Sequence, residues 1–317
     1  RLRMAESGSG QISGSGAIEP DDNLLQSELG QNLAVKRTST TAWARFRRHK
    51  LAMSGFALLL IYIISAVFAP LIAPQDPNFI DLTIIKQPPS SEHWLGTDRV
   101  GRDVFSRVLH AGRVSLTVGV LAAAISAAIG TVIGVVSGYI GGWTDDLLQR
   151  FTEIIMTFPS LFAVIILVGI TGPSVWNIIF VLGGLGWTGT VRLVRGQVLS
   201  LREMDYSTAA RALGASDKRL MFRHILPGVL PYVAVVATLM VAGAILTEAA
   251  LSFLGFGVKI PTATWGNMMQ QAQRLYVLRD MPWLWVPPGF VITTTVIAVN
   301  FIGDGMRDAL DPRTRIE

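Results

Sequence analysis

The side chains that most often carry chemistry are few in this chain, and they are not grouped. Cysteine is absent, which excludes a thiolate nucleophile and a thiolate metal site. The four histidines are scattered and lack the i, i+4 spacing of a metal-binding helix, so we expect no metal and no catalytic residue. These histidines are His49, His93, His110 and His224.

Phosphate-binding patterns do not indicate a nucleotide site either. Residues 184–189, Gly-Leu-Gly-Trp-Thr-Gly, match the dinucleotide fingerprint as a string, but they lie in an apolar stretch instead of between a strand and a helix. We interpret them as a helix-packing or flexible segment. The sequence contains no glycine-rich loop ending in Lys and Ser or Thr, the pattern that holds ATP phosphates. We therefore expect no cofactor on this chain.

One carboxylate stands out because its surroundings are apolar. Glu248 is the only charged residue between Ala242 and Phe253. A carboxylate at mid-depth in a membrane costs at least ~2.5 kcal/mol, so it needs a partner, water or a proton. Two interpretations stay open: a bonded group between helices, or a group that lines a transport pathway. Asn300 has the same two interpretations.

The composition is that of a membrane protein. Half of the residues are hydrophobic, and 15% are charged, against about a quarter in typical soluble domains. The excess of apolar residues indicates contact with a lipid bilayer. We attribute the net charge of +5 to cytoplasmic flanks of membrane spans, and we expect no nucleic-acid partner.

Uncharged stretches predict an all-α, polytopic protein with six transmembrane helices, because about 20 apolar residues in a helix cross a bilayer. Between Glu153 and Arg192 the stretch is too long for one helix, and the turn signal at residues 171–174 divides it into a hairpin. Pro159 is expected to kink the third span near its start. The other spans are expected at about residues 51–72, 114–140, 231–253 and 282–302.

Two basic clusters predict the orientation of these spans. Positive residues favour the cytoplasmic side, and one cluster, at residues 45–50, directly precedes the first span. The other lies between Arg192 and His224, where seven positive residues stand against three negative ones. With six spans, both termini are then cytoplasmic in a multi-pass protein.

Small residues recur every fourth position along the second span, which places them on one helical face. Backbones approach closely at such a face. We predict helix packing there, either within the subunit or against a partner chain. The residues are Ser126, Gly130, Gly134, Gly138 and Gly142.

The segment 203–216 between the fourth and fifth spans predicts two short helices at an angle. Alanines at 209, 210 and 212 favour a helix, Gly214 supplies a stop, and a second helix over about 218–224 leads to Pro227. Such an elbow either lies on the membrane surface or inserts into a groove of a soluble partner. Periodicity does not distinguish the two.

This segment resembles the cytoplasmic EAA loop of ABC importer permeases through Ala209-Ala210, Gly214 and Leu226-Pro227. Thr208 stands where the family usually has Glu, and His224 where it usually has Ile. The resemblance implies a coupling helix that docks into an ATP-binding subunit. The contacts it implies are Asp205, Tyr206, Thr208, Ala209, Ala210, Gly214, Ala215 and Ser216.

Further motifs over residues 45–315 resemble the second permease subunit of dipeptide and oligopeptide importers. The resemblance implies a type I importer permease fold and peptide import across the bacterial cytoplasmic membrane by alternating access. The motifs include Leu95-Gly-Thr-Asp98, Gly101-Arg-Asp103, Ser106-Arg107, Tyr139-Ile-Gly-Gly-Trp143, Phe158-Pro-Ser160, residues 191–198, Leu251-Ser-Phe-Leu-Gly-Phe-Gly257 and residues 303–312.

The partners implied by the resemblance are a homologous second permease, two cytoplasmic ATP-binding subunits that hold ATP and Mg, and an extracytoplasmic peptide-binding protein. The same machinery for nickel chelates or glutathione is the nearest alternative. An ion-driven secondary transporter belongs to another class, and the elbow counts against it. An intramembrane enzyme would need paired groups at one depth, which Glu248 and Asn300 do not provide.

The predicted organisation follows from these spans. It consists of a disordered cytoplasmic tail (1–42), an N-terminal transmembrane helix (43–73), an extracytoplasmic loop (74–113), a permease core of five helices (114–305) that contains the coupling loop 196–227, and a cytoplasmic tail (306–317).

Overall fold

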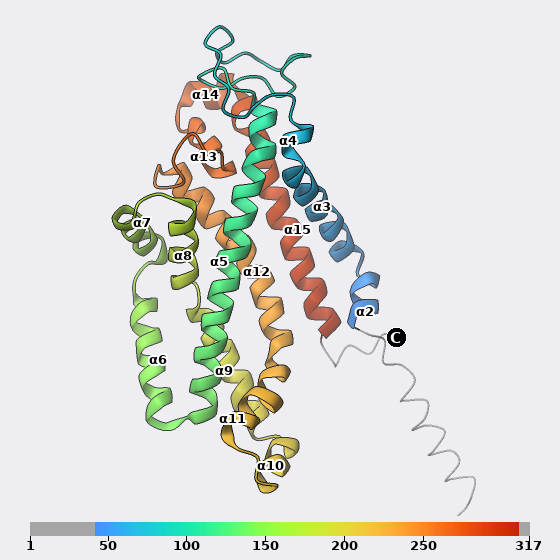
Figure 1. The fold of residues 1–317 in the computed structure, drawn as a ribbon, viewed down its shortest axis with the longest axis vertical. Helices are drawn as coiled ribbons and strands as arrows, with labels where there is room; N and C mark the ends of the chain where they lie inside the picture. Colours follow the sequence, from blue (N-terminus) through green and yellow to red (C-terminus); the bar gives the residue numbers. More distant parts are fainter. Residues whose placement is uncertain (1–41, 311–317) are drawn as a thin grey trace, which may run out of the picture. The chain divides into compact units, whose positions relative to one another are not determined.

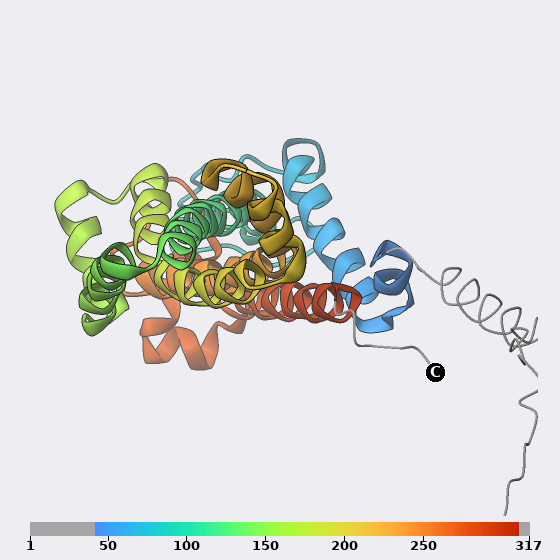
Figure 2. The ribbon, with the colours of Figure 1, turned by 90° about the horizontal axis from the view of Figure 1, so that it is seen from below.

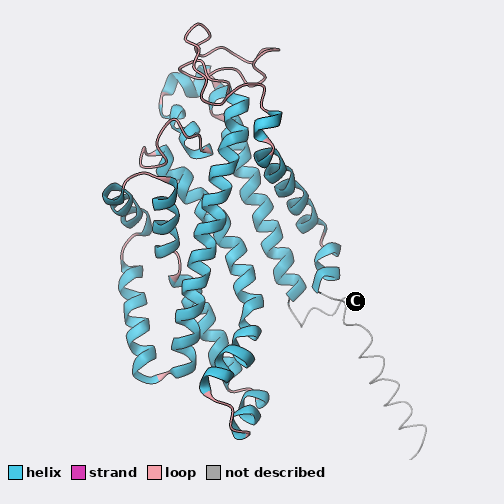
Figure 3. Cartoon of the chain, viewed as in Figure 1, coloured by secondary structure: helices cyan, strands magenta, loops and turns pink. Residues whose placement is uncertain are grey.

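The protein is seen here as a computed structural model that describes residues 42–310. These residues form helices and loops, with no strand among them (Figure 3). The all-α prediction is therefore confirmed. Four helical runs are long and apolar enough to cross a membrane, and the number rises to six if each of two bent helix pairs crosses once. The four runs are α3 (Lys50–Val67), α5 (Val104–Ile140), Asp217–Phe253 and α15 (Val286–Leu310).

The region of the predicted third and fourth spans consists of two bent helix pairs, which corrects the expectation of a simple hairpin. Helices α6 (Gly142–Thr157) and α7 (Ser160–Thr171) meet at 85°, next to Pro159, whose ring removes a backbone donor. Helices α8 (Val175–Leu185) and α9 (Thr188–Arg202) meet at 40°. The predicted turn is confirmed between α7 and α8, where Gly172 has a φ of +92°. The kink predicted at Pro159 is thus a bend of 85° between two separate helices.

Helix α5 lies at the centre of the bundle and packs on α3, α8, α9 and α12 (Leu226–Phe253), while α15 packs on α3 and α12 (Figures 1 and 2). The short helices α10 (Asp205–Ala212) and α11 (Asp217–Arg219) lie at one end of the bundle, which we call the elbow end. Loop 74–103, α13 (Trp265–Met269) and α14 (Leu275–Asp280) lie at the opposite end, which we call the loop end.

The remaining elements are short. Helix α2 (Ala42–Arg48) precedes α3, and α4 (Ala69–Ile72) follows it. The π-helix η1 (Leu220–Ile225) joins α11 to α12. The 3-10 helices η2 (Gln270–Gln273) and η3 (Pro282–Leu284) flank α14.

Several element bounds differ from those predicted. Helix α5 begins at Val104 and not near residue 114, because the Asp103 carboxylate accepts the Ser106 N–H at 2.7 Å and caps the helix there. The loop predicted over 74–113 is correspondingly shorter. Helix α15 extends to Leu310, past the predicted core boundary at 305. Apart from these helical residues, the predicted tails 1–42 and 306–317 lie outside the described residues.

The glycine face of α5 packs against α9 of the same chain. A Cβ added at Gly130 would lie 2.5 Å from the Thr190 Cβ, and one at Gly134 would lie 2.7 Å from the Val194 Cβ. At Gly138 the added atom would be 3.0 Å from the Arg195 carbonyl oxygen. These three glycines are therefore a contact surface within the subunit. Gly142 is not part of it, since no atom lies within 4 Å of an added Cβ there.

Replacing Gly134 by valine is expected to lower the free energy of unfolding by about 1–3 kcal/mol, because overpacking forces α5 and α9 apart. The measurement is the midpoint of chemical unfolding in detergent. Gly196→Val is the matched control, because Gly196 lies on α9 with nothing within 4 Å of an added Cβ. Equal midpoints for the two variants would contradict the close α5–α9 contact.

Candidate functional site

The elbow (residues 203–219) consists of α10, a tight turn and α11. The turn has the Schellman hydrogen bonds: the Gly214 N–H donates to the Arg211 carbonyl at 3.0 Å, and the Ala215 N–H donates to the Ala210 carbonyl at 3.1 Å. Gly214 has a φ of +82°, where a side chain would be strained. The first predicted helix and its glycine stop are confirmed. The second helix differs, because α11 continues through η1 into α12 without a break.

The inner face of the elbow is fixed to the bundle. The Ser207 side chain is fully buried, and its hydroxyl donates to the Leu201 carbonyl at 2.8 Å. Ala210 and Ala215 are partly buried and pack on an apolar cluster. Ser207 and the two alanines thus hold α10 against the end of α9. The cluster is formed by Ala127, Val135, Tyr139, Val194, Val198, Leu220, Met221, Ile225, Val229 and Val233.

Two polar contacts attach the elbow and the adjoining end of α9 to the end of α5. The Tyr139 hydroxyl donates to the Asp217 carboxylate at 2.7 Å. The Arg202 guanidinium donates to the Tyr139 carbonyl at 3.1 Å. A charged or carboxylate partner strengthens such hydrogen bonds. The elbow therefore follows the position of α5 as well as that of α9 and α12.

A further ion pair fixes the α5–α6 turn to α9. The Arg195 guanidinium donates to both Asp145 oxygens, with Nε–Oδ1 at 2.7 Å and Nη2–Oδ2 at 2.6 Å. The Ser137 hydroxyl also donates to Asp145. A two-point contact of this kind fixes direction as well as distance. The base of the elbow is thus one connected unit built from α5, α6 and α9.

The outer face of the elbow is exposed and carries three large apolar side chains, which we together call the apolar knob. Leu213 is 89% exposed, Met204 is 47% exposed and Tyr206 is 44% exposed. Large apolar side chains that stay exposed on one short segment are candidates for contact with another molecule. Around them lie the smaller exposed residues Asp205, Thr208, Ala209, Gly214 and Ser216.

The structure divides the residues that the sequence singled out in the elbow. Asp205, Tyr206, Thr208, Ala209, Gly214 and Ser216 lie on the outer face, whereas Ala210 and Ala215 point toward the bundle. Sequence reasoning missed Leu213, the most exposed apolar residue of the elbow. Leu213 is the C-cap residue of α10, directly before the helix-stopping Gly214, and the sequence carries no signal of its exposure.

Glu248 lies far along α12 from the elbow and is fully buried. The Ser252 hydroxyl donates to its Oε1 at 2.7 Å, and the Ser115 hydroxyl lies 3.4 Å from its Oε2. Ser115 also accepts the backbone N–H of Trp265 at 3.1 Å. Of the two interpretations left open, this arrangement supports a bonded group between helices, here α5, α12 and α13. Asn300 is half-buried on α15 and has no side-chain hydrogen bond among the described residues.

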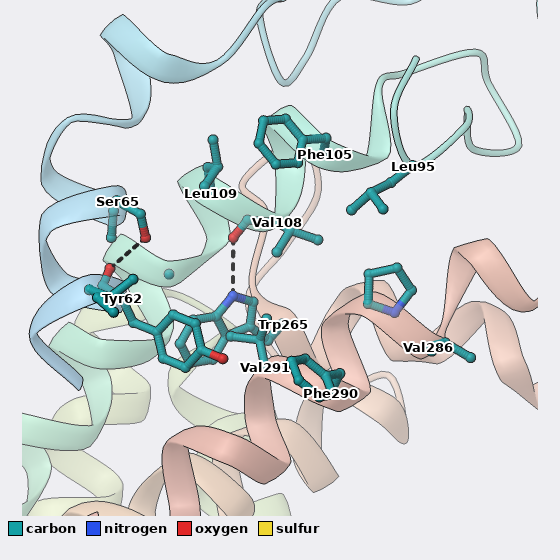
Figure 4. Close-up of a pocket in the computed structure, with 14 residues that line it drawn as sticks. Tyr62, Ser65, Leu95, Phe105, Val108, Leu109, Trp265, Val286, Phe290 and Val291 are labelled. Atoms are coloured by element: carbon teal, nitrogen blue, oxygen red, sulfur yellow. Dashed lines mark hydrogen bonds between the residues drawn. The ribbon is translucent and has the colours of Figure 1, made fainter. Parts of the chain in front are cut away.

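A cavity of about 490 Å³ lies between α3, α5, α13 and α15, toward the loop end (Figure 4). The Trp265 indole donates to the Val108 carbonyl at 3.1 Å, and the Tyr62 hydroxyl lies 2.7 Å from the Thr294 hydroxyl. The Ser65 hydroxyl donates to the Tyr62 carbonyl at 2.9 Å, so the polar side chains that line the cavity already have partners. Its apolar wall therefore offers no partner for a charged solute. Within residues 42–310, no three His, Asp or Glu side chains are placed to share a metal ion.

Two family models match the chain. The model described as "Binding-protein-dependent transport system inner membrane component" matches residues 130–316, and the N-terminal TM domain of oligopeptide transport permease C matches residues 39–89. The first match contains the elbow, α12 and α15. The second contains α3 and the start of the loop that follows it.

Three relatives from different genera are similar over most of the chain. A putative peptide permease protein of Brucella suis biovar 1 is 43% identical over 290 residues, which are 91% of this chain and 96% of the relative. The oligopeptide transport system permease protein OppC of Bacillus subtilis is 41% identical over 89% of this chain and 93% of its own. The glutathione transport system permease protein GsiD of Shigella flexneri serotype 5b is 41% identical over 86% and 90%.

Proposed function

This chain belongs to the inner membrane components of binding-protein-dependent transport systems, the permease subunits of ABC importers, and we propose that it imports di- and oligopeptides as one half of a permease pair. The elbow supports this proposal most directly, since it presents an exposed apolar knob on a base fixed to three helices. The names of the Brucella and Bacillus relatives favour peptides as cargo. Glutathione, the solute in the name of the Shigella relative, is itself a short peptide.

We assign the elbow end to the cytoplasm and the loop end to the outside. The basic residues before α3 and around the elbow favour this orientation. Each of two cytoplasmic ATP-binding subunits would then receive one elbow, one from this chain and one from a homologous permease. ATP and Mg would be held by those subunits. An extracytoplasmic peptide-binding protein would deliver cargo at the loop end.

The mechanism follows from how the elbow is attached. An ATP-driven displacement of the docked elbow acts on α9 through Ser207 and on α5 through the Tyr139–Asp217 hydrogen bond. It also acts on α12 directly, because α11 and η1 are continuous with that helix. Closely packed helices move as bodies and do not deform gradually, so the membrane helices change their inclination together. Tilting of the two permease halves opens the pathway to alternate sides.

The test is uptake of labelled di-, tri- and longer peptides, and of nickel, in cells that lack this gene and in complemented cells. Loss of peptide uptake that the gene restores is the expected result. A defect for nickel alone would retain the importer and reassign the cargo. Peptide uptake that persists in ATP-depleted cells with an intact ion gradient would contradict the importer mechanism itself.

A further inference from the structure

A small polar pocket of about 200 Å³ lies at the loop end, between residues 99–107 and residues 260–274. Four guanidinium groups line it, together with side-chain amides and with no carboxylate among the described lining residues. The arginines are Arg99, Arg102, Arg107 and Arg274.

The positive charge at this pocket is poorly balanced. Asp98 is the carboxylate that contacts the cluster, and the Arg102 guanidinium occupies it, with Nε–Oδ2 and Nη2–Oδ2 both at 2.7 Å. Asp98 also accepts the backbone N–H groups of Val100 and Arg102. The Arg107 Nε is 3.9 Å from the same carboxylate, which is too far for a hydrogen bond. One carboxylate thus stands against four guanidinium groups.

The excess of positive charge is energetically unfavourable at Arg107, because this residue is only 3% exposed and its charge is therefore poorly solvated. One of its amino groups, Nη1, donates to the Pro77 carbonyl at 2.9 Å. A guanidinium has five N–H donors, and a buried charge is unfavourable unless it is paired. An anion that entered the pocket would supply the missing acceptors. Paired oxygens suit the fork of a guanidinium best, which favours a carboxylate.

The amides of the pocket indicate what accompanies that carboxylate. The Asn267 amide is already engaged, because it donates to the Thr262 carbonyl at 2.8 Å and accepts the Thr264 N–H at 3.1 Å. Gln271 differs: its side-chain oxygen is buried without a donor among the residues described. Because Gln271 lines the pocket, a rotation of its amide would present this acceptor to a ligand that brings an N–H group. A peptide C-terminus has both parts, a carboxylate and the N–H of the last residue.

We propose that this pocket binds the C-terminal carboxylate of a peptide arriving from outside. The assignment rests on the proposed function for its cargo class and its orientation. The volume is below the roughly 300–1,000 Å³ of sites that enclose a whole small molecule, so the pocket takes one end of the peptide. Its wall includes Met268 of α13, the helix that is bonded to Ser115 through the Trp265 N–H. Binding here therefore contacts a segment that is tied to α5 and α12.

The test uses the complete importer in proteoliposomes with its peptide-binding protein. The variant is Arg99→Gln combined with Arg274→Gln, since both side chains are exposed and neither is bonded to Asp98. Arg279→Gln is the matched control, because Arg279 is an exposed arginine of α14 that does not line the pocket. Uptake is measured for trialanine and for trialanine amide, which lacks the carboxylate. For each peptide, the KM of the variant is divided by the KM of the wild type. This ratio cancels any preference of the binding protein for one of the two peptides.

We expect the double variant to raise the KM for trialanine roughly tenfold, which corresponds to the loss of one charge-assisted contact. The KM for trialanine amide should stay within about twofold of the wild-type value. Arg279→Gln changes neither. Equal losses for the two peptides would overturn the proposal and assign the arginines to another contact, such as an acidic side chain of the binding protein. No loss for either peptide would overturn it as well.

A separate binding measurement distinguishes this proposal from the peptide-cargo proposal. Calorimetric titration of the detergent-solubilised importer with trialanine and its amide reports on the pocket without transport. If wild type transports neither peptide, the proposed cargo fails, and the pocket is judged by this titration alone. Tighter binding of the free acid, lost in the double variant, supports the pocket, and equal binding of acid and amide overturns it.

Discussion

Leu213→Asp is expected to abolish ATP-driven uptake, by at least about thirtyfold, while the permease stays folded in the membrane. Leu213 is 89% exposed, so the substitution removes almost no packing within the chain. If the elbow docks into an ATP-binding subunit as proposed, the new carboxylate would be buried there without a partner, and central contacts of this kind commonly carry about 2 kcal/mol or more. The measurements are peptide uptake and co-purification of the ATP-binding subunits.

Leu275→Asp is the matched control for this prediction. Leu275 is 78% exposed and begins α14 at the loop end. Its replacement by Asp is therefore the same chemical change, made far from the elbow. We expect this variant to retain its ATP-binding subunits. Retention of those subunits and of uptake by Leu213→Asp would refute the elbow as the docking site. Loss of the subunits by both variants would point to a general defect in assembly.

Glu248→Ala is expected to lower the free energy of unfolding by about 2–4 kcal/mol, through a cavity between α5 and α12 and the loss of an acceptor for two buried hydroxyl groups. The measurement is the midpoint of chemical unfolding in detergent, compared with wild type.

Glu248→Gln keeps the shape of the side chain and replaces one carboxyl oxygen by an amide nitrogen. Glutamine has nearly the same volume and keeps an oxygen for Ser252, so we expect it to lose less than about 1 kcal/mol and to support uptake close to wild type. A loss for glutamine as large as that for alanine would show that both carboxyl oxygens are required. An alanine variant as stable as wild type would contradict the bonded role.

The features that sequence reasoning predicted correctly are those with local causes. The end of α10 depends on Gly214 and on hydrogen bonds within six residues, and the turn before α8 depends on Gly172. The start of α5 has a partly distant cause. Loop 95–103 is held by the Thr97 N–H donating to the Gln87 carbonyl and by the Lys86 N–H donating to the Asp98 carbonyl. Apolar stretches alone do not reveal this pairing, so the helix was expected to start later.

The contacts that position the candidate site could not be predicted from the sequence, because they join residues that are far apart in the chain. Tyr139 and Asp217 are 78 residues apart, and Arg195 and Asp145 are 50 residues apart. Hydropathy marks where helices lie but not how one helix is rotated toward another. It likewise gave two apolar spans between 153 and 192 without the 85° change of direction at Pro159. The division of the elbow alanines between inner and outer faces depends on the same rotation.

The unbroken helical run from Asp217 to Phe253 acts as a lever between the two ends of the molecule. At 1.5 Å per residue its 37 residues are about 55 Å long, so a tilt of about 5° about the middle moves each tip by roughly 2 Å in opposite directions. One tip lies at the elbow, and the other carries Glu248 and its bonds toward α13. In the proposed mechanism, a displacement of the elbow would therefore move the loop end of this helical run in the opposite direction.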